Sequence, residues 1–274
     1  MRLYGLVGCR ISYTLSPHIH NTVFRLLNVD AKYDVIDISE DVFDIEILKV
    51  FEKYSGLNVT IPYKVRILKY IDKFTEEALQ VGAINTIKID NGVKIGHNTD
   101  IYGIERALKR YGIDISGSVA LILGAGGAAR AAVYIFNKLK VSKIIVANRS
   151  RERSLELKNH FKKFGIDVEI VDWDSRVEYA EKADVIINCT PVGTLSSESP
   201  LPQHVFKPGK VVIDMVYRPR ITKMLEYARE RGCKIVDGLT ILIYQALVAD
   251  EFWLDVKIGD DIFEEVENSL MKIL

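Results

Sequence analysis

The chain has 274 residues, of which 48% are apolar and 27% charged, a composition typical of a globular protein that excludes disordered, collagen-like and low-complexity chains. Lysine and arginine together number 37, as do aspartate and glutamate, so no net positive charge favours binding to a nucleic-acid backbone. The length is near the limit for a single hydrophobic core, and we expect two domains.

The three cysteines, Cys9, Cys189 and Cys233, lie far apart and form neither a CxxC pair nor a disulfide framework. The first residues contain no apolar segment followed by a small-residue cleavage site, and no apolar run is long enough to cross a bilayer. We therefore expect a cytoplasmic protein without membrane contact. The sequence leaves open whether it is a monomer or a homodimer.

The first hundred residues alternate strand-like and helix-like patterns. Their periodicity predicts strands at 2–8, 32–38 and 56–62 and helices at 16–28, 41–53 and 63–71. Two further strand-like runs within 85–98 are joined by Asn91 and Gly92, which tolerate the positive φ of a hairpin turn. A helix at 99–112 follows and ends at Gly112. This order predicts an N-terminal α/β domain.

A second series of strands is short and apolar throughout, with helical segments between most of them. These runs lie within 118–124, 143–150, 167–172, 183–191, 210–217 and 233–239. Strands buried on both faces are typical of a parallel sheet covered by helices, so residues 108–237 are predicted to form a doubly wound, Rossmann-like domain. The segments 239–254 and 262–274 are helical with no following strand. We expect them to return to the first domain, which then comprises residues 1–107 and 238–274.

The sequence LILGAGGAARAA places Gly124, Gly126 and Ala129 at the three positions of the G-x-G-x-x-G/A fingerprint, after a strand and at the start of a helix. The glycines permit a tight turn and close approach of a pyrophosphate, and the helix N-terminus supplies amide donors. An ordinary strand-to-helix turn is the alternative, which this context disfavours. The cofactor-binding residues predicted here are Gly124, Ala125, Gly126, Gly127, Ala128 and Ala129.

The end of the next strand indicates which dinucleotide is bound. An acidic side chain there would contact the ribose 2′-hydroxyl of NAD, but this chain has Asn148, followed by Arg149, Ser150 and Arg151. Guanidinium and hydroxyl groups suit a 2′-phosphate, so the sequence predicts NADP. A solvated basic loop is the alternative, and Glu152 lies within the same stretch.

Several motifs occur together in a fixed order along the chain: TLSPHIHN, NVTIPYK, GAINT, GHNTD, GAGGAARA, NRS, NCTPVG, DMVYRP and DGLTILIYQA. They resemble, in that order, segments of the shikimate dehydrogenases, and the resemblance covers nearly the whole chain. It implies an NADP-dependent oxidoreductase that reversibly reduces 3-dehydroshikimate to shikimate, a step of aromatic amino-acid biosynthesis. It also implies that Thr190 and Gly238 contact the cofactor.

Lys64 and Asp100 are the catalytic candidates. From the residues alone, Lys64 is a surface lysine in the first turn of a helix, and Asp100 caps free amides at a helix start. The resemblance instead pairs them, because a proton must reach or leave the C3 oxygen as hydride moves. We assign Lys64 the principal acid/base role. Which of the two carries the proton is left open by the sequence.

The substrate is an anion with several hydroxyls, so its pocket needs hydroxyl and amide partners. The resemblance assigns the ring carboxylate to Thr14 and Ser16, with Tyr217 as a further donor. It assigns the ring hydroxyls to Thr60, Asn85, Asp100 and Gln245, while Asn58 orders the loop around Lys64. Capping of the helix that contains Pro17 is the alternative role of Ser16. Thr14 stands where the family usually has serine, which leaves the range of substrates open.

Two other functions remain as alternatives: a quinate/shikimate dehydrogenase that accepts NAD, and a sensor that binds the dinucleotide or shikimate without turnover. The presence of Lys64 and Asp100 argues against the sensor. The five histidines form no ligand spacing with carboxylates or cysteines, so we predict no metal. The expected partners are small molecules only.

Overall fold

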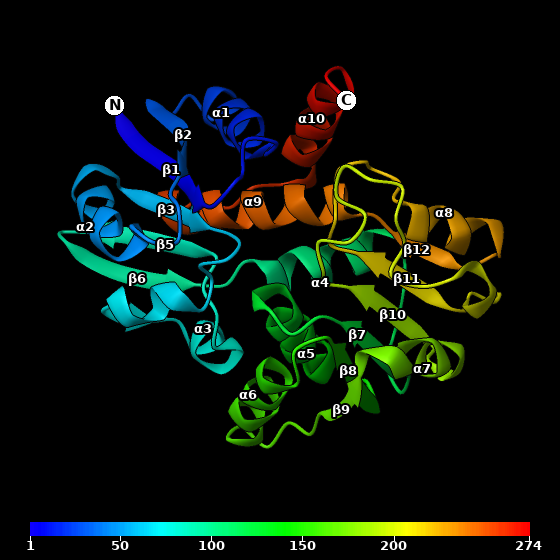
Figure 1. Cartoon of the computed structure of the whole chain (residues 1–274). Helices are drawn as coiled ribbons and strands as arrows, with labels where there is room; N and C mark the ends of the chain where they lie inside the picture. Colours follow the sequence, from blue (N-terminus) through cyan, green and yellow to red (C-terminus); the bar gives the residue numbers. More distant parts are fainter. The chain divides into compact units, whose positions relative to one another are not determined.

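The first sheet combines parallel and antiparallel strands in the order β2-β1-β3-β5-β6-β4 (Figure 1). Strand β1 pairs in parallel with β2 and β3, and β3 pairs antiparallel with β5. Its strands are β1 (Arg2–Gly8), β2 (Ala31–Asp37), β3 (Gly56–Val59), β4 (Lys73–Phe74), β5 (Thr86–Asp90) and β6 (Val93–His97). The helices in this part of the chain are α1 (Ser16–Leu26), α2 (Phe43–Lys53) and α3 (Glu76–Val81). The predicted hairpin is present as β5 and β6, with Asn91 at φ 49° and Gly92 at φ 79°.

The segment after β3 departs from the predicted helix at 63–71. It forms turns and a short 3₁₀ helix, Arg66–Tyr70, and the chain is extended again at Ile71. Burial of Tyr63 and Ile67, four residues apart, gives the segment its helical pattern, but one turn is enough to bury both. The helix α3 was not predicted. Its first turn is capped by Thr75, which accepts a hydrogen bond from the Ala78 amide.

The second sheet is parallel throughout, in the order β12-β11-β10-β7-β8-β9. Its strands are β7 (Val119–Leu123), β8 (Lys143–Asn148), β9 (Glu169–Asp172), β10 (Val185–Asn188), β11 (Val211–Asp214) and β12 (Lys234–Val236). The helices here are α4 (Asp100–Arg110), α5 (Gly127–Lys138), α6 (Arg151–Lys162), α7 (Arg176–Lys182) and α8 (Lys223–Glu230). The predicted doubly wound, Rossmann-like sheet is confirmed, and the strand order reverses between β7 and β10.

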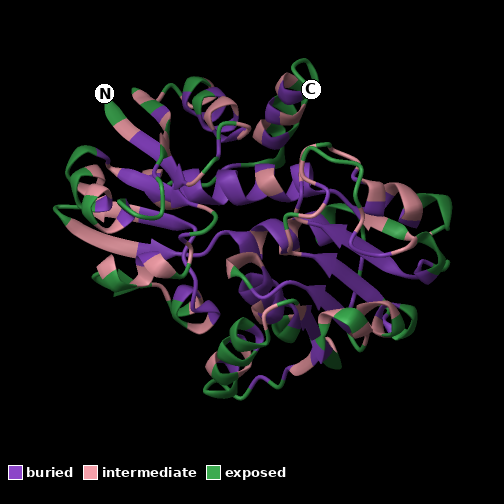
Figure 2. Ribbon diagram, viewed as in Figure 1, coloured by how far each residue is buried: buried purple, intermediate pink, exposed green.

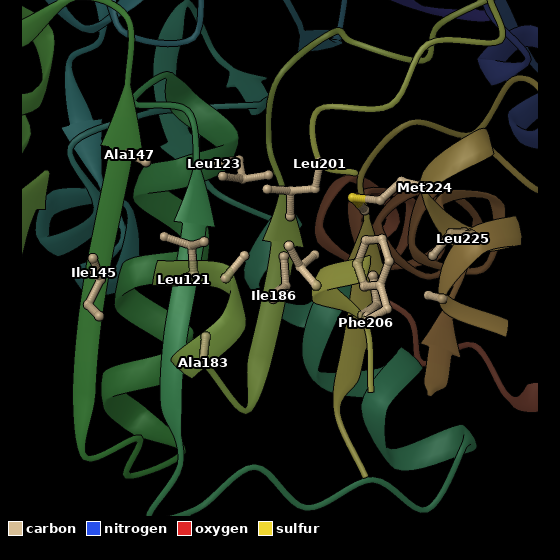
Figure 3. Close-up of a cluster of buried hydrophobic side chains, with 14 of the residues drawn as sticks. Leu121, Leu123, Ile145, Ala147, Ala183, Ile186, Leu201, Phe206, Met224 and Leu225 are labelled. Atoms are coloured by element: carbon tan, nitrogen blue, oxygen red, sulfur yellow. The ribbon is translucent and has the colours of Figure 1, made fainter. Parts of the chain in front are cut away.

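One face of this sheet carries an apolar core in which side chains of neighbouring strands lie in register (Figure 3). Leu121 of β7 pairs with Ile145 of β8 on one side and with Ile186 of β10 on the other. Met224 and Phe206 pack against the same cluster. Each such buried side chain contributes about 1.5–3 kcal/mol, so this core holds the strand ends that follow it in a fixed arrangement.

The structure, a computed structural model, describes all 274 residues, which divide into two compact units. One consists of residues 1–102 and 243–274, the other of residues 103–242. The divisions fall inside α4 and inside α9 (Gly238–Leu254), whereas we expected them after residue 107 and before residue 238. Because each division lies within a continuous helix, no linker composition marks it in the sequence.

The C-terminal helices return to the first unit, as predicted. The last helix, α10 (Asp260–Met271), packs on α1, where His18 Nε2 and Ser269 Oγ are 2.7 Å apart. Figure 2 shows α9 mostly as a buried ribbon, which explains why its sequence is apolar nearly all round. None of the helices combines the length and apolar character needed to cross a bilayer.

Candidate active site

Lys64 and Asp100 form an ion pair in the first unit. The Lys64 Nζ atom donates to Asp100 Oδ2 at 2.5 Å, and the two side chains are 15% and 5% exposed. Lys64 follows β3, and its carbonyl accepts a hydrogen bond from the Ile84 amide at 2.8 Å, which ties this turn to the segment before β5. The pair is sheltered, but the Lys64 side chain keeps some accessible surface, as a proton-transfer site requires.

Asn85 holds the other oxygen of the Asp100 carboxylate. Its Nδ2 atom donates to Asp100 Oδ1 at 2.8 Å, to Thr99 Oγ1 at 2.9 Å and to Gln245 Oε1 at 3.2 Å. Its Oδ1 atom accepts from the Thr99 amide at 2.7 Å. Both carboxylate oxygens therefore receive a charge-assisted or amide hydrogen bond, which fixes the orientation of the carboxylate. Four predicted residues, Lys64, Asn85, Asp100 and Gln245, are joined in this way.

Thr14 and Ser16 lie together at the start of α1. The Thr14 hydroxyl donates to Ser16 Oγ at 3.1 Å and also accepts from the Ser16 amide at 3.2 Å. Ser16 does not cap the helix, because the N-cap is Leu15 and Ser16 is the first helical residue. Since the Ser16 oxygen accepts from Thr14, its own proton remains for another acceptor, such as a carboxylate.

Thr60 and Asn58 mark the end of β3. Thr60 is half-buried, and its methyl group covers Gly8, where an added Cβ would lie 2.6 Å from Thr60 Cγ2. Asn58 is buried, and its amide donates to the Asn85 carbonyl at 3.1 Å and to Thr86 Oγ1 at 3.0 Å. Asn58 therefore orders the start of β5, whereas we expected it to order the loop around Lys64.

The glycine-rich turn in the second unit has the features needed for phosphate binding. Gly124 follows β7 with φ 108°, and a Cβ added there would lie 3.1 Å from the carbonyl oxygen of Cys189. A Cβ added to Gly126 would meet no atom within 4 Å, so the backbone there is open to a ligand. Gly126 is also the N-cap of α5, with no side-chain cap and no acidic residue in the first turn. The free amides and open backbone fit a dinucleotide pyrophosphate.

The remaining residues of this turn are small for reasons of packing and access. Ala125 and Ala129 are buried, and Ala129 lies where the fingerprint requires close contact between helix and sheet. Gly127 and Ala128 are half-exposed at the start of α5. This pattern is that of a turn whose outer surface is left free.

The loop after β8 presents Arg149 outward. Asn148 Nδ2 donates to the Ser150 carbonyl at 2.8 Å, and Ser150 caps α6 by accepting from the Arg153 amide at 3.3 Å. Arg149 is exposed, while Arg151 forms an exposed ion pair with Asp172 at 3.1 Å. The loop has no carboxylate where NAD would need one, and its cations fit a 2′-phosphate.

A buried acid beside the predicted Thr190 was not anticipated from the sequence. Asp214 ends β11 and accepts from Thr222 Oγ1 at 2.6 Å, from Asn188 Nδ2 at 2.9 Å and from the Val216 amide at 3.0 Å. Burial raises the pKa of Asp214 to about 7. Asn188 in turn accepts from the Thr190 hydroxyl at 2.7 Å, so this network fixes the turn after β10. The only signal in the sequence is an acid at the end of an apolar strand.

Tyr217 and Gly238 lie further along the second unit. Tyr217 is half-buried in the turn after β11. Gly238 begins α9, where an added Cβ would lie 2.3 Å from the carbonyl oxygen of Val216. Packing against that carbonyl is therefore sufficient to require glycine at this position, independently of the cofactor contact that we predicted.

Comparison with known proteins identifies the family. Residues 6–87 match the family model of the shikimate dehydrogenase substrate binding domain, and residues 105–220 match that of shikimate / quinate 5-dehydrogenase. A shikimate dehydrogenase (NADP(+)) from Clostridium perfringens is 37% identical over 276 residues, which cover 97% of this chain and 99% of the relative. The chain belongs to the shikimate dehydrogenase family.

Solved structures of shikimate dehydrogenases share the whole architecture. The enzyme from Thermus thermophilus, in complex with NADP(H) and shikimate, is 30% identical with a TM-score of 0.85, covering 98% of this chain and all of that chain (100%). The enzyme from Listeria monocytogenes, in complex with shikimate and NAD, is 32% identical with a TM-score of 0.84, covering 97% and 96%. Both cofactors are thus found in shikimate dehydrogenases of this fold.

Proposed function

We propose that this protein is an NADP-dependent shikimate dehydrogenase, which interconverts shikimate and 3-dehydroshikimate in aromatic amino-acid biosynthesis. The observation that carries the proposal is the sheltered Lys64–Asp100 ion pair at 2.5 Å, in a chain related over 97% of its length to NADP(+)-dependent shikimate dehydrogenases. None of the three cysteines forms a disulfide, in keeping with a cytoplasmic enzyme.

Proton transfer is assigned to Lys64. In the reducing direction, the Lys64 ammonium donates a proton to the C3 oxygen of the substrate and becomes the neutral amine. In the oxidising direction, the neutral Lys64 amine accepts the proton of the C3 hydroxyl and becomes the ammonium. Asp100 holds the ammonium in place through Oδ2, and Asn85 fixes Asp100 through Oδ1. NADPH supplies the hydride when it is bound.

Substrate binding is assigned to hydroxyl and amide groups. Thr14 and Ser16 bind the ring carboxylate, because the Ser16 proton is left for an acceptor by the Thr14–Ser16 hydrogen bond. Thr60, Asn85 and Gln245 bind ring hydroxyls, and Tyr217 adds a phenolic donor.

Cofactor binding is assigned to the second unit. The open backbone at Gly126 and the uncapped N-terminus of α5 receive the pyrophosphate. Arg149, with Ser150 and Asn148 behind it, binds the 2′-phosphate of NADP.

The direct test is a steady-state assay of the purified protein at 340 nm with shikimate or quinate, each with NADP or NAD. We expect the highest kcat/KM for shikimate with NADP. Absence of an absorbance rise with all four pairs would overturn the enzyme function and leave the sensor. A higher kcat/KM with NAD would instead identify the NAD-using enzyme, for which the Listeria complex with NAD is the precedent.

A further inference from the structure

Two adjacent residues of the motif TLSPHIHN, His20 and Asn21, have no part in the proposed reaction. Both contact Tyr33 of β2. The His20 ring stacks on the Tyr33 ring with centroids 4.2 Å apart and planes 11° apart. Asn21 accepts from the Tyr33 amide at 3.0 Å and donates to its carbonyl at 3.3 Å. The ring and the backbone of one tyrosine are thus held by two adjacent residues of α1.

His20 is itself fixed by a partner from α9. Its Nδ1 atom lies 2.8 Å from Asp250 Oδ1, and both side chains have no exposed surface. His20 Nε2 and Asp250 Oδ2 have no hydrogen-bond partner, so this pair carries an uncompensated desolvation cost. A polar pair kept in the core at such a cost is expected to fix the orientation of a neighbouring side chain, here the Tyr33 ring, more precisely than an apolar pair would.

The Tyr33 hydroxyl begins a continuous run of hydrogen bonds to the catalytic pair. Tyr33 Oη donates to Asn58 Oδ1 at 2.7 Å, and Asn58 Nδ2 donates to Thr86 Oγ1 at 3.0 Å. The Thr86 hydroxyl donates to Asn85 Oδ1 at 3.0 Å, and Asn85 Nδ2 donates to Asp100 Oδ1 at 2.8 Å. Four hydrogen bonds, through the three side chains of Asn58, Thr86 and Asn85, therefore connect Tyr33 to the carboxylate that holds Lys64.

The direction of these hydrogen bonds follows from their chemistry. An ionised carboxylate only accepts, so Asn85 must turn its NH₂ group toward Asp100 and its oxygen toward Thr86. The Thr86 hydroxyl then donates its hydrogen bond to Asn85 and accepts one from Asn58. The oxygen of Asn58 is left for a donor, and the Tyr33 hydroxyl is that donor. Reversal of the Asn58 amide would place its oxygen against the Asn85 carbonyl, 3.1 Å from the present nitrogen, where two acceptors would meet.

We propose that Tyr33, Asn58 and Thr86 are positioning residues for the reaction, which orient the Asn85 amide and through it the Asp100 carboxylate, and that His20 and Asn21 hold Tyr33 at the start of this chain. The inference rests on the proposed function, since Asp100 matters there through Lys64. His20 and Asn21, the last two residues of the TLSPHIHN motif, thus have a role distinct from the carboxylate binding assigned to Thr14 and Ser16.

The test is Tyr33→Phe, which removes one hydroxyl and keeps the stacked ring. We expect kcat for shikimate oxidation to fall about tenfold while KM changes less than about threefold, because a misoriented acid slows proton transfer more than it weakens binding. Tyr4→Phe is the matched control: Tyr4 is equally buried in the same aromatic cluster, but its hydroxyl faces Arg2. The control should keep wild-type kcat, and both variants should melt within a few degrees of each other.

Thr86→Val removes the hydroxyl of Thr86 and so interrupts the same run of hydrogen bonds at another point, without changing the shape of the side chain. If the residues act as one unit, Thr86→Val also lowers kcat about tenfold, and the double variant Tyr33→Phe/Thr86→Val is no slower than either single variant. Wild-type kcat in Tyr33→Phe, or a hundredfold loss in the double variant, would overturn the proposal.

A crystal structure of Tyr33→Phe gives a readout that does not depend on turnover. We expect the Asn58 amide to lose its fixed orientation and the distance from Asn85 Nδ2 to Asp100 Oδ1 to lengthen beyond 3.5 Å in part of the molecules. An unchanged Asn85–Asp100 hydrogen bond in this variant would contradict the positioning role. Failure of the wild type to oxidise shikimate or quinate would instead overturn only the proposed function.

Discussion

At the scale of single residues, Lys64 is the group on which the proposed chemistry depends. Its ammonium is paired with the Asp100 carboxylate, and 15% of the Lys64 side chain remains accessible. In the Lys64–Asp100 pair the carboxylate is buried, whereas in the ion pair of Lys88 with Asp255, at 2.6 Å, the carboxylate is exposed. An ion pair with an exposed partner contributes little to stability.

We predict that Lys64→Ala lowers kcat for shikimate oxidation by about 10²- to 10⁴-fold, the usual loss for an acid/base group. Shikimate should still bind, because hydroxyl and amide groups hold it, and binding is measured by isothermal titration calorimetry. Lys88→Ala serves as the control and should keep wild-type kcat. Retention of most activity in Lys64→Ala would remove Lys64 from proton transfer.

Arg149 is the residue expected to distinguish the two cofactors. We predict that Arg149→Ala raises the Kd for NADP about tenfold or more and changes the Kd for NAD less than about twofold, because only NADP carries the phosphate that pairs with a guanidinium. Both constants are measured by titration calorimetry. Lys162→Ala, which removes an exposed charge from the far end of α6, should leave both constants unchanged. Equal losses for the two dinucleotides in Arg149→Ala would assign the arginine another role.

At the scale of elements, the turn between β7 and α5 uses its glycines for two separate purposes. Gly124 has a positive φ of 108° and is closely approached by the Cys189 carbonyl, so the fold requires it. Gly126 has φ −86° and ψ −166°, which any residue adopts, and no atom lies near the position of an added Cβ. Folding therefore does not require glycine at 126, and ligand access does.

This difference predicts opposite outcomes for two alanine variants. Gly124→Ala should lower the free energy of unfolding by about 1–3 kcal/mol through backbone strain. Gly126→Ala should change the free energy of unfolding by less than about 0.5 kcal/mol, yet raise the Kd for NADP about tenfold, since its methyl group would occupy the place of the pyrophosphate. Urea denaturation and titration calorimetry measure the two quantities. Unimpaired NADP binding by Gly126→Ala would show that the pyrophosphate lies elsewhere.

At the scale of the whole molecule, the two units contain buried titratable groups that respond to pH in opposite directions. In the first unit, burial lowers the pKa of His97 from its usual 6.5 to about 4. Its contribution to stability is present above pH 6.5 and is lost as the pH falls toward 4, by up to about 3 kcal/mol. In the second unit, burial raises the pKa of Asp214 from 3.8 to about 7. Its contribution is present below pH 4 and is lost as the pH rises toward 7, by up to about 4 kcal/mol.

We therefore predict opposite contributions from these two groups when the pH falls from 7 to 4.5: His97 destabilises the first unit, and Asp214 stabilises the second. The chain has 2 tryptophans, Trp253 in the first unit and Trp173 in the second, so the variants Trp173→Phe and Trp253→Phe report one unit each by fluorescence during urea unfolding. His97→Gln should flatten the pH dependence of the first unit, and Asp214→Asn that of the second. Identical pH dependence of the two midpoints would contradict this prediction.

Features that depend on neighbouring residues could be predicted from the sequence. Apolar runs predicted the buried parallel strands, Asn91 and Gly92 predicted the hairpin, and the spacing of Gly124 and Gly126 predicted the turn before α5. Each of these follows from local backbone geometry or from burial on both faces of a strand. The two-part architecture with a returning C-terminus was predictable for the same reason, since helices without a following strand must pack on an existing layer.

The side chains around Asp100 and the burial of titratable groups depend on packing between distant segments and could not be predicted. Asn85 and Gln245 lie 160 positions apart and meet through a hydrogen bond, which no local pattern encodes. The burial of Asp214, and the division of the chain within α4 and α9, likewise depend on packing between distant segments. Local propensity specifies the elements, whereas the electrostatic environment of a side chain is set by all the elements packed around it.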